Sequence, residues 1–242
     1  MDVEDVDSID VDKSDFIFEK SERIIVTGSS GSGKTHFVEQ LVKKYSDKFY
    51  KIVICGNPNR LLDFEETACK TTHHKSDRNP IFDPFTMLDK YEVKKNANKQ
   101  FLLIFDDLME IIFKSSVVSQ IFSKGRHSNL TCILLMQSYF PGGSGTNIYP
   151  QIKLNSTINI FTRIKSKTQI GNISRKLEDD REGQNFFINI YNKFVQDIKY
   201  GYLAHFFEAQ DQLRYVTNLI NEDGSPYLTA HKQTFFHSNQ DV

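Results

Sequence analysis

The chain has 242 residues and a mass of 28.0 kDa, a length that suits one α/β domain with a sizeable core. Hydrophobic residues make up 39% of it, and 20 phenylalanines with no tryptophan are expected to supply much of the core volume. The formal net charge of −1 and the pI of about 6.7 argue against a general polyanion-binding surface. Any contact with nucleic acid must therefore come from local basic patches.

An acidic segment begins the chain. From Asp2 to Asp15 it alternates valine or isoleucine with aspartate, which predicts an arm over residues 1–20 that is disordered or ordered by a partner. It lacks a positive segment followed by an apolar one, so no signal peptide is expected. No membrane span is expected either, because Asp106 and Asp107 interrupt the longest apolar region. Residues 21–242 are expected to form a single domain.

A glycine-rich loop follows the arm and matches the phosphate-binding pattern G-x-x-x-x-G-K-[ST] at every constrained position. The β-branched run at 23–27 predicts a buried strand before it, and an apolar helical face at 34–46 predicts a helix after it. Glycines let the backbone turn its N–H groups toward a β-phosphate, and the helix N-terminus adds a favourable dipole. The loop comprises Gly28, Ser29, Ser30, Gly31, Ser32, Gly33, Lys34 and Thr35.

Two side chains of this loop have predicted roles of their own. Lys34 is expected to reach the β- and γ-phosphates, and the Thr35 hydroxyl to ligate Mg²⁺. The alternative is a glycine-serine turn with a chance lysine, which the flanking strand and helix make the weaker interpretation. The sequence therefore predicts a nucleoside-triphosphate site.

Strands and helices alternate along the rest of the chain, which predicts an α/β fold with a mainly parallel sheet and right-handed crossovers. The expected elements are a strand at 51–55, an irregular polar region at 57–84, a helix at 85–96, a strand at 101–106, a helix at 108–123, a strand at 131–136, a turn-rich loop at 139–145, a strand at 157–161, helices at 166–178 and 183–196, and strands at 201–207 and 213–217.

Two carboxylates end the apolar run at 101–106, which is typical of a buried parallel strand. Ligands of such sheets lie at the carboxyl ends of the strands. Asp106 is expected to hold Mg²⁺ directly or through water, and Asp107 to orient or deprotonate the attacking water. The alternative is an Asp-Asp helix N-cap, which is common after strands.

Gln137 follows the next apolar strand, at 131–136. An amide at the tip of a strand beside the acidic one can contact both the γ-phosphate and the water, provided that this strand lies between the loop strand and the aspartate strand. The alternative is a solvated loop residue.

Arg126 precedes that strand and is the candidate for an arginine finger, a side chain that reaches a neighbouring subunit's γ-phosphate. The alternative is a cation that faces a helix C-terminus, and Arg163 and Arg175 are rival candidates.

The three cysteines are Cys55, Cys69 and Cys132. Their odd number predicts free thiols in a reducing, intracellular compartment.

Five segments together resemble the viral genome-packaging ATPases of the FtsK/HerA superfamily, the group found in poxvirus-like and Polinton-like elements. They are GSSGSGKT, LLIFDD, GRH with the following CILLMQSYFP, NSTINIFTRIKS and KYGYLAHFFEAQDQLRYVTNL, and the resemblance runs from about Glu22 to Leu219. The phosphate loop is common to many NTPases, whereas the GRH segment and its strand are much more specific. Relatives often have glutamate where this chain has Asp107.

The resemblance implies a homo-oligomeric ring that hydrolyses ATP with Mg²⁺ and drives double-stranded DNA into a preformed capsid, in contact with capsid or portal-type proteins. It also implies a single P-loop domain of the additional-strand type. A cationic stretch with Lys165, Lys167, Arg175 and Lys176 is the candidate DNA contact, although such a stretch is more often a solvated helical face.

Two other classes of function stay open from the residues. A P-loop kinase or GTPase-like switch is one, but the chain shows neither D-x-x-G and N-K-x-D at the expected places nor an arginine-rich lid. A structural protein that nucleotide stabilises without turnover is the other.

Overall fold

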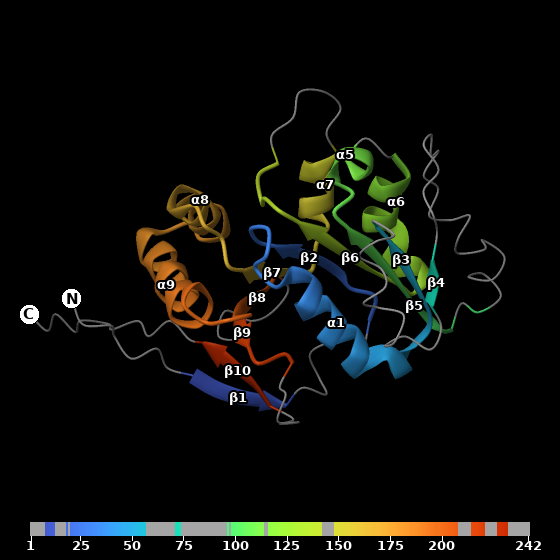
Figure 1. The fold of residues 1–242 in the computed structure, drawn as a ribbon, viewed down its shortest axis with the longest axis horizontal. Coiled ribbons are helices and arrows are strands. Elements are labelled where there is room, and N and C mark those ends of the chain that lie inside the picture. Colours follow the sequence, from blue (N-terminus) through green and yellow to red (C-terminus); the bar gives the residue numbers. More distant parts are fainter. Residues whose placement is uncertain are drawn as a thin grey trace, which may run out of the picture.

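The computed structural model describes residues 8–12, 18, 20–56, 71–73, 96, 98–113, 116–141, 148–207, 214–220 and 227–231. These residues form one ten-stranded sheet with the strand order β1-β10-β9-β8-β7-β2-β6-β5-β3-β4 (Figure 1). Its strands are β1 (Ser8–Asp12), β2 (Arg23–Thr27), β3 (Phe49–Cys55), β4 (Thr71–His73), β5 (Gln100–Asp106), β6 (Leu130–Met136), β7 (Ile158–Thr162), β8 (Tyr202–Phe206), β9 (Tyr215–Thr217) and β10 (Tyr227–His231).

Helices lie on both faces of this sheet. The α-helices of the described residues are α1 (Lys34–Tyr45), α5 (Met109–Ile112), α6 (Ser116–Lys124), α7 (Tyr149–Leu154), α8 (Lys167–Leu177) and α9 (Arg181–Tyr191). Short turns of other helix types are η2 (Ser46–Lys48), η3 (Gly125–Ser128) and η4 (Asn192–Gln196).

The strands from β4 to β7 in this order are mutually parallel, and β8, β9, β10 and β1 continue the sheet in antiparallel pairs. The predicted α/β fold with a mainly parallel sheet is confirmed, and so is the additional strand, because β6 lies between β2 and β5. The two closing strands depart from the parallel prediction. The strand β8 is antiparallel to β7 although α8 and α9 lie between them in the chain. The segment between β8 and β9 is too short for a crossover, so β9 returns antiparallel to β8.

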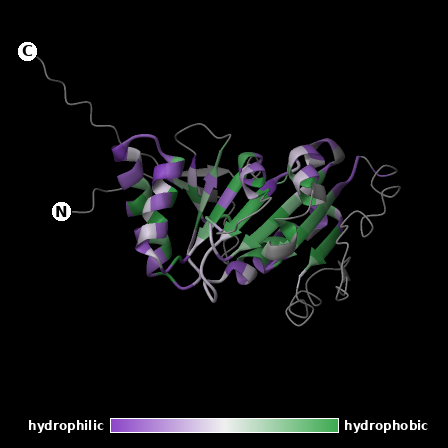
Figure 2. Cartoon of the chain, turned by 90° about the horizontal axis from the view of Figure 1, so that it is seen from above, coloured by the Kyte–Doolittle hydropathy of each residue, from purple (hydrophilic) through white to green (hydrophobic). Residues whose placement is uncertain are grey.

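Alternating side chains of the central strands fill separate layers of the core. On β2, Ile24 and Val26 pack in the cluster that contains α1, whereas Ile25 packs in the cluster that contains α6 and α7. This period of two is what a strand with helices on both faces requires. Figure 2 shows the resulting arrangement, with strongly hydrophobic strands between helices of mixed character. A third cluster joins α8 and α9 to β7, β8 and β9.

Several elements differ from the predictions. The helix predicted at 108–123 is two helices, α5 and α6, and α7 was not predicted. The predicted helix at 85–96 lies outside the described residues except for Asn96, and β4 falls within the region predicted as irregular. Inside the predicted N-terminal arm, β1 pairs with β10 as an edge strand, because its alternating valine, isoleucine and aspartate suit a pleated edge. The division into arm and domain stays a prediction.

The structure also bears on the predictions about membrane spans and cysteines. No helix among the described residues has the length and apolarity that a membrane span needs. Cys55 and Cys132 are buried free thiols, and Cys69 lies outside the described residues.

Candidate functional site

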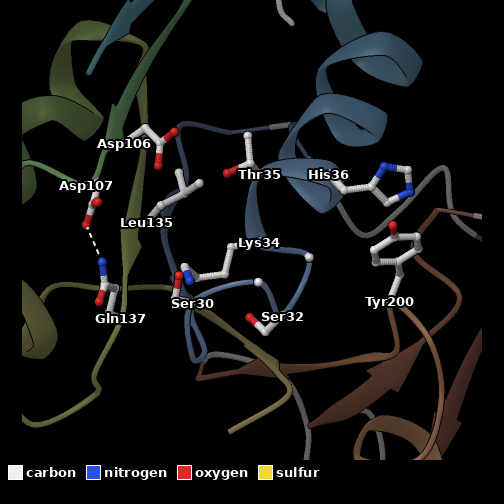
Figure 3. A pocket seen from close by; sticks show the side chains of 12 residues that line it. Ser30, Ser32, Lys34, Thr35, His36, Asp106, Asp107, Leu135, Gln137 and Tyr200 are labelled. Atoms are coloured by element: carbon white, nitrogen blue, oxygen red, sulfur yellow. Dashed lines mark hydrogen bonds between the residues drawn. The ribbon is translucent and has the colours of Figure 1, made fainter. Parts of the chain in front are cut away.

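One cavity of about 390 Å³ lies at the carboxyl ends of the central strands β2, β5 and β6 (Figure 3). It brings together the glycine-rich loop, both aspartates and the glutamine, which are far apart in the sequence. Its lining residues are Ser30, Gly31, Ser32, Gly33, Lys34, Thr35, His36, Asp106, Asp107, Leu135, Gln137 and Tyr200.

The backbone of the loop suits an anion. Gly31 and Gly33 have φ angles of 71° and 92°, the left-handed region in which glycine carries no Cβ penalty. The helix α1 begins directly after Gly33, which has no side chain to cap the first N–H groups of the helix. These N–H groups and the positive end of the helix dipole therefore face the cavity, as a bound phosphate requires.

Neighbouring strands fix the loop in position. The Gly28 N–H donates to the Met136 carbonyl at the end of β6 over 3.2 Å. The Ser29 N–H donates to the Arg163 carbonyl beyond β7 over 3.0 Å. The hydroxyls of Ser32 and Thr162 are 2.7 Å apart. The loop is thus attached to both strands that flank β2.

A buried tyrosine stiffens the end of β7 that supports the loop. The Tyr191 hydroxyl donates to the Thr162 carbonyl over 3.1 Å and accepts from the Ile164 N–H over 2.7 Å. Burial raises the pKa of Tyr191 to about 12, so the hydroxyl keeps its proton and both bonds at neutral pH.

The space around Gly28 has no room for a side chain, so a substitution there tests how tightly the loop packs against β7. A Cβ there would lie 1.9 Å from the Thr162 hydroxyl oxygen and 2.6 Å from that of Ser32. We expect Gly28→Ala to lower the free energy of unfolding by about 1–3 kcal/mol, measured by urea denaturation, because this part of the loop must shift.

The matched control is Gly171→Ala in α8, where a Cβ meets no atom within 4 Å. It is expected to raise the free energy of unfolding by about 0.5–1 kcal/mol, since alanine is the better helix former. Equal stability of the two variants would show that the packing around Gly28 is not tight.

Lys34 extends from the first turn of α1 across the loop. Its ammonium donates to the carbonyls of Gly28 over 2.8 Å and Ser29 over 3.0 Å. Figure 3 shows the side chain extending toward the side of the cavity that holds Asp107 and Gln137. Its positive charge is therefore placed between the loop and these polar groups.

The two aspartates occupy different environments. Asp106 ends β5 and is 3% exposed, whereas Asp107 is exposed and has a φ of 56°. The Gln137 side-chain amide donates to a carboxylate oxygen of Asp107 over 2.9 Å. Figure 3 shows the Asp106 carboxylate opposite the Thr35 hydroxyl. Because α5 begins only at Met109, neither aspartate directly precedes that helix, as an N-cap would.

Of the three arginine candidates, Arg163 and Arg175 are not among the described residues that line this cavity. Arg126 is in η3, which precedes β6, so its backbone lies at the opposite end of that strand from Gln137. Its side chain lies outside the described residues. Arg163 follows β7 beside the loop of its own chain, and Arg175 donates to Asn172 within α8.

Two aromatic residues line the cavity although no sequence pattern predicts them there. His36 follows Thr35 in α1, and Tyr200 lies between η4 and β8, far along the chain. Their ring centroids are 4.4 Å apart with an interplanar angle of 35°. No motif links these two positions, so only the fold could reveal their contact.

Comparison of the sequence with known proteins gives a matching family model and several curated relatives. Residues 81–177 match the family model described as "Poxvirus A32 protein". The DNA packaging protein OPG160 of Variola virus is 30% identical over 128 residues, 48% of this chain and 46% of the relative. Its counterpart in Vaccinia virus (strain Copenhagen) is 31% identical over 132 residues, with the same coverage. The chain thus spans about half the length of the curated relatives it matches.

Comparison with solved structures extends the likeness to nearly the whole chain. The genome packaging NTPase B204 from Sulfolobus turreted icosahedral virus 2, in complex with ATP-gammaS, has a TM-score of 0.55 at 15% identity and covers 89% of this chain and 98% of its own. ATPases 2 and 3 of EssC from Geobacillus thermodenitrificans give 0.56 at 11% identity, over 89% of this chain and 40% of theirs. The chain therefore has the fold of these P-loop proteins, and its resemblance to viral genome-packaging ATPases is confirmed.

Proposed function

We propose that this chain is an ATP-hydrolysing motor that translocates double-stranded DNA and packages a viral genome into a capsid. The observation that carries the proposal is the convergence of the loop, Asp106, Asp107 and Gln137 on one cavity, with β6 between β2 and β5. Relatives named DNA packaging protein support the DNA-translocating part.

The loop and Lys34 bind and orient the triphosphate. Backbone N–H groups at Gly31 and at residues 33–35 surround the β-phosphate, and the Lys34 ammonium balances the charge of the β- and γ-phosphates. Holding the γ-phosphoryl group in line with the attacking water supplies much of the catalysis in this chemistry, because little covalent work is left to the protein.

Thr35 and Asp106 would hold Mg²⁺. Both offer hard oxygen donors, and they face each other across the cavity (Figure 3). No set of three His, Cys, Asp or Glu side chains within the described part of the chain forms a metal site, so phosphate oxygens and water would complete the coordination. Bound there, Mg²⁺ would neutralise charge on the phosphates.

Asp107 and Gln137 would position the attacking water. Their hydrogen bond of 2.9 Å fixes the carboxylate and the amide relative to each other. A carboxylate can accept a proton from water while the neighbouring amide contacts the γ-phosphate. Gln137 therefore has a place in both the binding of the phosphate and the orientation of the water.

The proposed DNA contact is the basic stretch on and before α8. Lys165, Lys167, Arg175 and Lys176 are exposed. Three acids, Glu178, Asp179 and Asp180, follow this stretch and partly offset its charge. Glu178 accepts hydrogen bonds from Tyr215 and Arg214, and Asp180 caps α9 through the Gly183 N–H. Of these acids, Glu178 has its charge balanced by a partner, Arg214, and a ring would repeat the basic stretch around a channel.

Turnover of ATP with and without double-stranded DNA, measured alongside the mass of the assembled species, tests the proposal. We expect hydrolysis by an oligomer that rises several-fold with double-stranded DNA and less with single-stranded DNA. A monomer whose turnover ignores DNA would contradict the motor, and an absence of turnover in every condition would favour a structural role.

Arg126 is the proposed finger in trans, because its backbone lies at the far end of β6 from its own cavity. We expect Arg126→Ala to slow hydrolysis by about 10³-fold or more while ATP still binds. Mixing Arg126→Ala with Lys34→Ala subunits should restore activity, since an intact loop then meets an intact arginine. Arg181→Ala removes an exposed arginine of α9 that has no place in the proposed site, so this control should hydrolyse normally. Normal turnover of an Arg126→Ala oligomer would remove Arg126 from this role.

A further inference from the structure

The cavity has two chemically different sides. Asp107 and Gln137 lie on one side of the loop, and the rings of His36 and Tyr200 lie on the other (Figure 3). The first side offers charged and amide groups to water and phosphate. The second offers aromatic surface, which neither a phosphate nor a metal ion needs.

Resting on the proposed function, in which the cavity binds ATP, this asymmetry sets the orientation of the nucleotide in the cavity. The γ-phosphate must lie beside Asp107 and Gln137, because that is where the water is oriented. The β-phosphate lies over the loop at the start of α1. The nucleoside then leaves the loop on the remaining side, where His36 and Tyr200 are in contact.

Tyr200 is held against the loop yet keeps an open surface. Its φ is 61°, a conformation that a bulky residue rarely adopts. A Cβ on Gly33 would lie 2.7 Å from its ring, so the ring packs directly on the glycine that precedes α1. Tyr200 is nevertheless 50% exposed. Strain and exposure of a large aromatic residue beside a binding loop point to a functional constraint.

The other neighbours of the ring leave room for a ligand. The His36 ring lies at a tilt of 35° to it, and the ammonium of Lys199 is 5.2 Å from the ring centroid. Lys199 is itself exposed, and a flexible side chain of this kind is readily displaced by a flat ring or drawn to the phosphates. Both the aromatic surface and the positive charge suit a nucleotide.

We propose that Tyr200, with His36, forms the platform on which the nucleobase of the substrate stacks. Every base has a π-face, so the platform raises the affinity for nucleoside triphosphates above that for inorganic tripolyphosphate. Purine nucleotides are bound more tightly than pyrimidine nucleotides because their rings cover more aromatic surface. Stacking alone does not separate adenine from guanine.

The absence of tryptophan from the whole chain allows a direct optical test. Tyr200→Trp introduces a single tryptophan at the platform, and Phe207→Trp places the control at another exposed aromatic position, outside the cavity lining. We expect ATP and GTP to quench the tryptophan fluorescence of Tyr200→Trp strongly, CTP weakly and tripolyphosphate hardly at all. The fluorescence of Phe207→Trp should not respond.

Affinity measurements on variants without tryptophan complete the test. By calorimetry, Tyr200→Ala should bind ATP about tenfold more weakly while its affinity for tripolyphosphate stays unchanged, and Tyr200→Phe should keep the affinity for ATP. Equal affinity of the wild type for ATP and tripolyphosphate, with no quenching in Tyr200→Trp, would overturn the platform and leave the phosphate site intact. Failure of the wild type to bind either compound would instead overturn the proposed function itself.

Discussion

Lys34→Ala is expected to abolish ATP hydrolysis, with kcat/KM at least about 100-fold below that of the unchanged chain. The ammonium, held by two loop carbonyls at 2.8 and 3.0 Å, is the cation that lies within the phosphate-binding loop itself. Without it, negative charge on the β- and γ-phosphates is not balanced as the γ-phosphoryl group is transferred. Steady-state release of inorganic phosphate measures the loss.

The matched control for Lys34 lies on the same helix. Lys43 is exposed in the last turn of α1, so Lys43→Ala removes the same charge far from the loop and should leave turnover unchanged. Capsid filling gives a second readout. If capsids fill normally with Lys34→Ala, hydrolysis at this site is not what moves DNA. That result would favour the alternative of a structural protein that nucleotide stabilises without turnover.

Asp107→Asn is expected to keep ATP binding and to slow hydrolysis by about 10²–10⁴-fold, the range that a positioned acid or base supplies. Asparagine removes the charge but preserves the size of the side chain. It also tolerates the φ of 56° at this position, because asparagine and aspartate enter the left-handed region more readily than other residues. Single-turnover measurements separate hydrolysis from binding.

A second substitution at the same position tests the geometry. Asp107→Glu restores a carboxylate that is longer by one methylene. It should retain much more activity than Asp107→Asn, despite a less favourable backbone conformation. Near-wild-type turnover of Asp107→Asn would remove this residue from the role of water-positioner, and Gln137 would then be the next candidate.

The central part of the fold was predictable because local signals and packing agree there. The strand that ends at Asp106 and the strand that precedes Gln137 are buried and mostly apolar, as burial on both faces demands. The loop pattern places Lys34 at the start of a helix. Once these strands are parallel, their carboxyl ends meet at one edge of the sheet, so the convergence of the predicted residues follows from the topology.

The features that escaped prediction depend on contacts distant in sequence. The position of Tyr200 beside His36 is set by the path of the chain after η4, and no pattern around either residue marks it. The short helix α7 lacks a full amphipathic period. The pairing of β1 with β10 joins the two ends of the described chain, and a sequence of alternating aspartates is equally compatible with an unpaired segment.

The outermost strands of the sheet bear on how copies of this chain can associate. Within the described residues, one border is β1, which contains Asp10 and Asp12, and the other is β4, which is only three residues long. Acidic or very short borders discourage the main-chain hydrogen bonding by which one sheet continues into the next. If copies assemble as proposed, we expect them to do so through complementary side-chain surfaces rather than through a shared sheet.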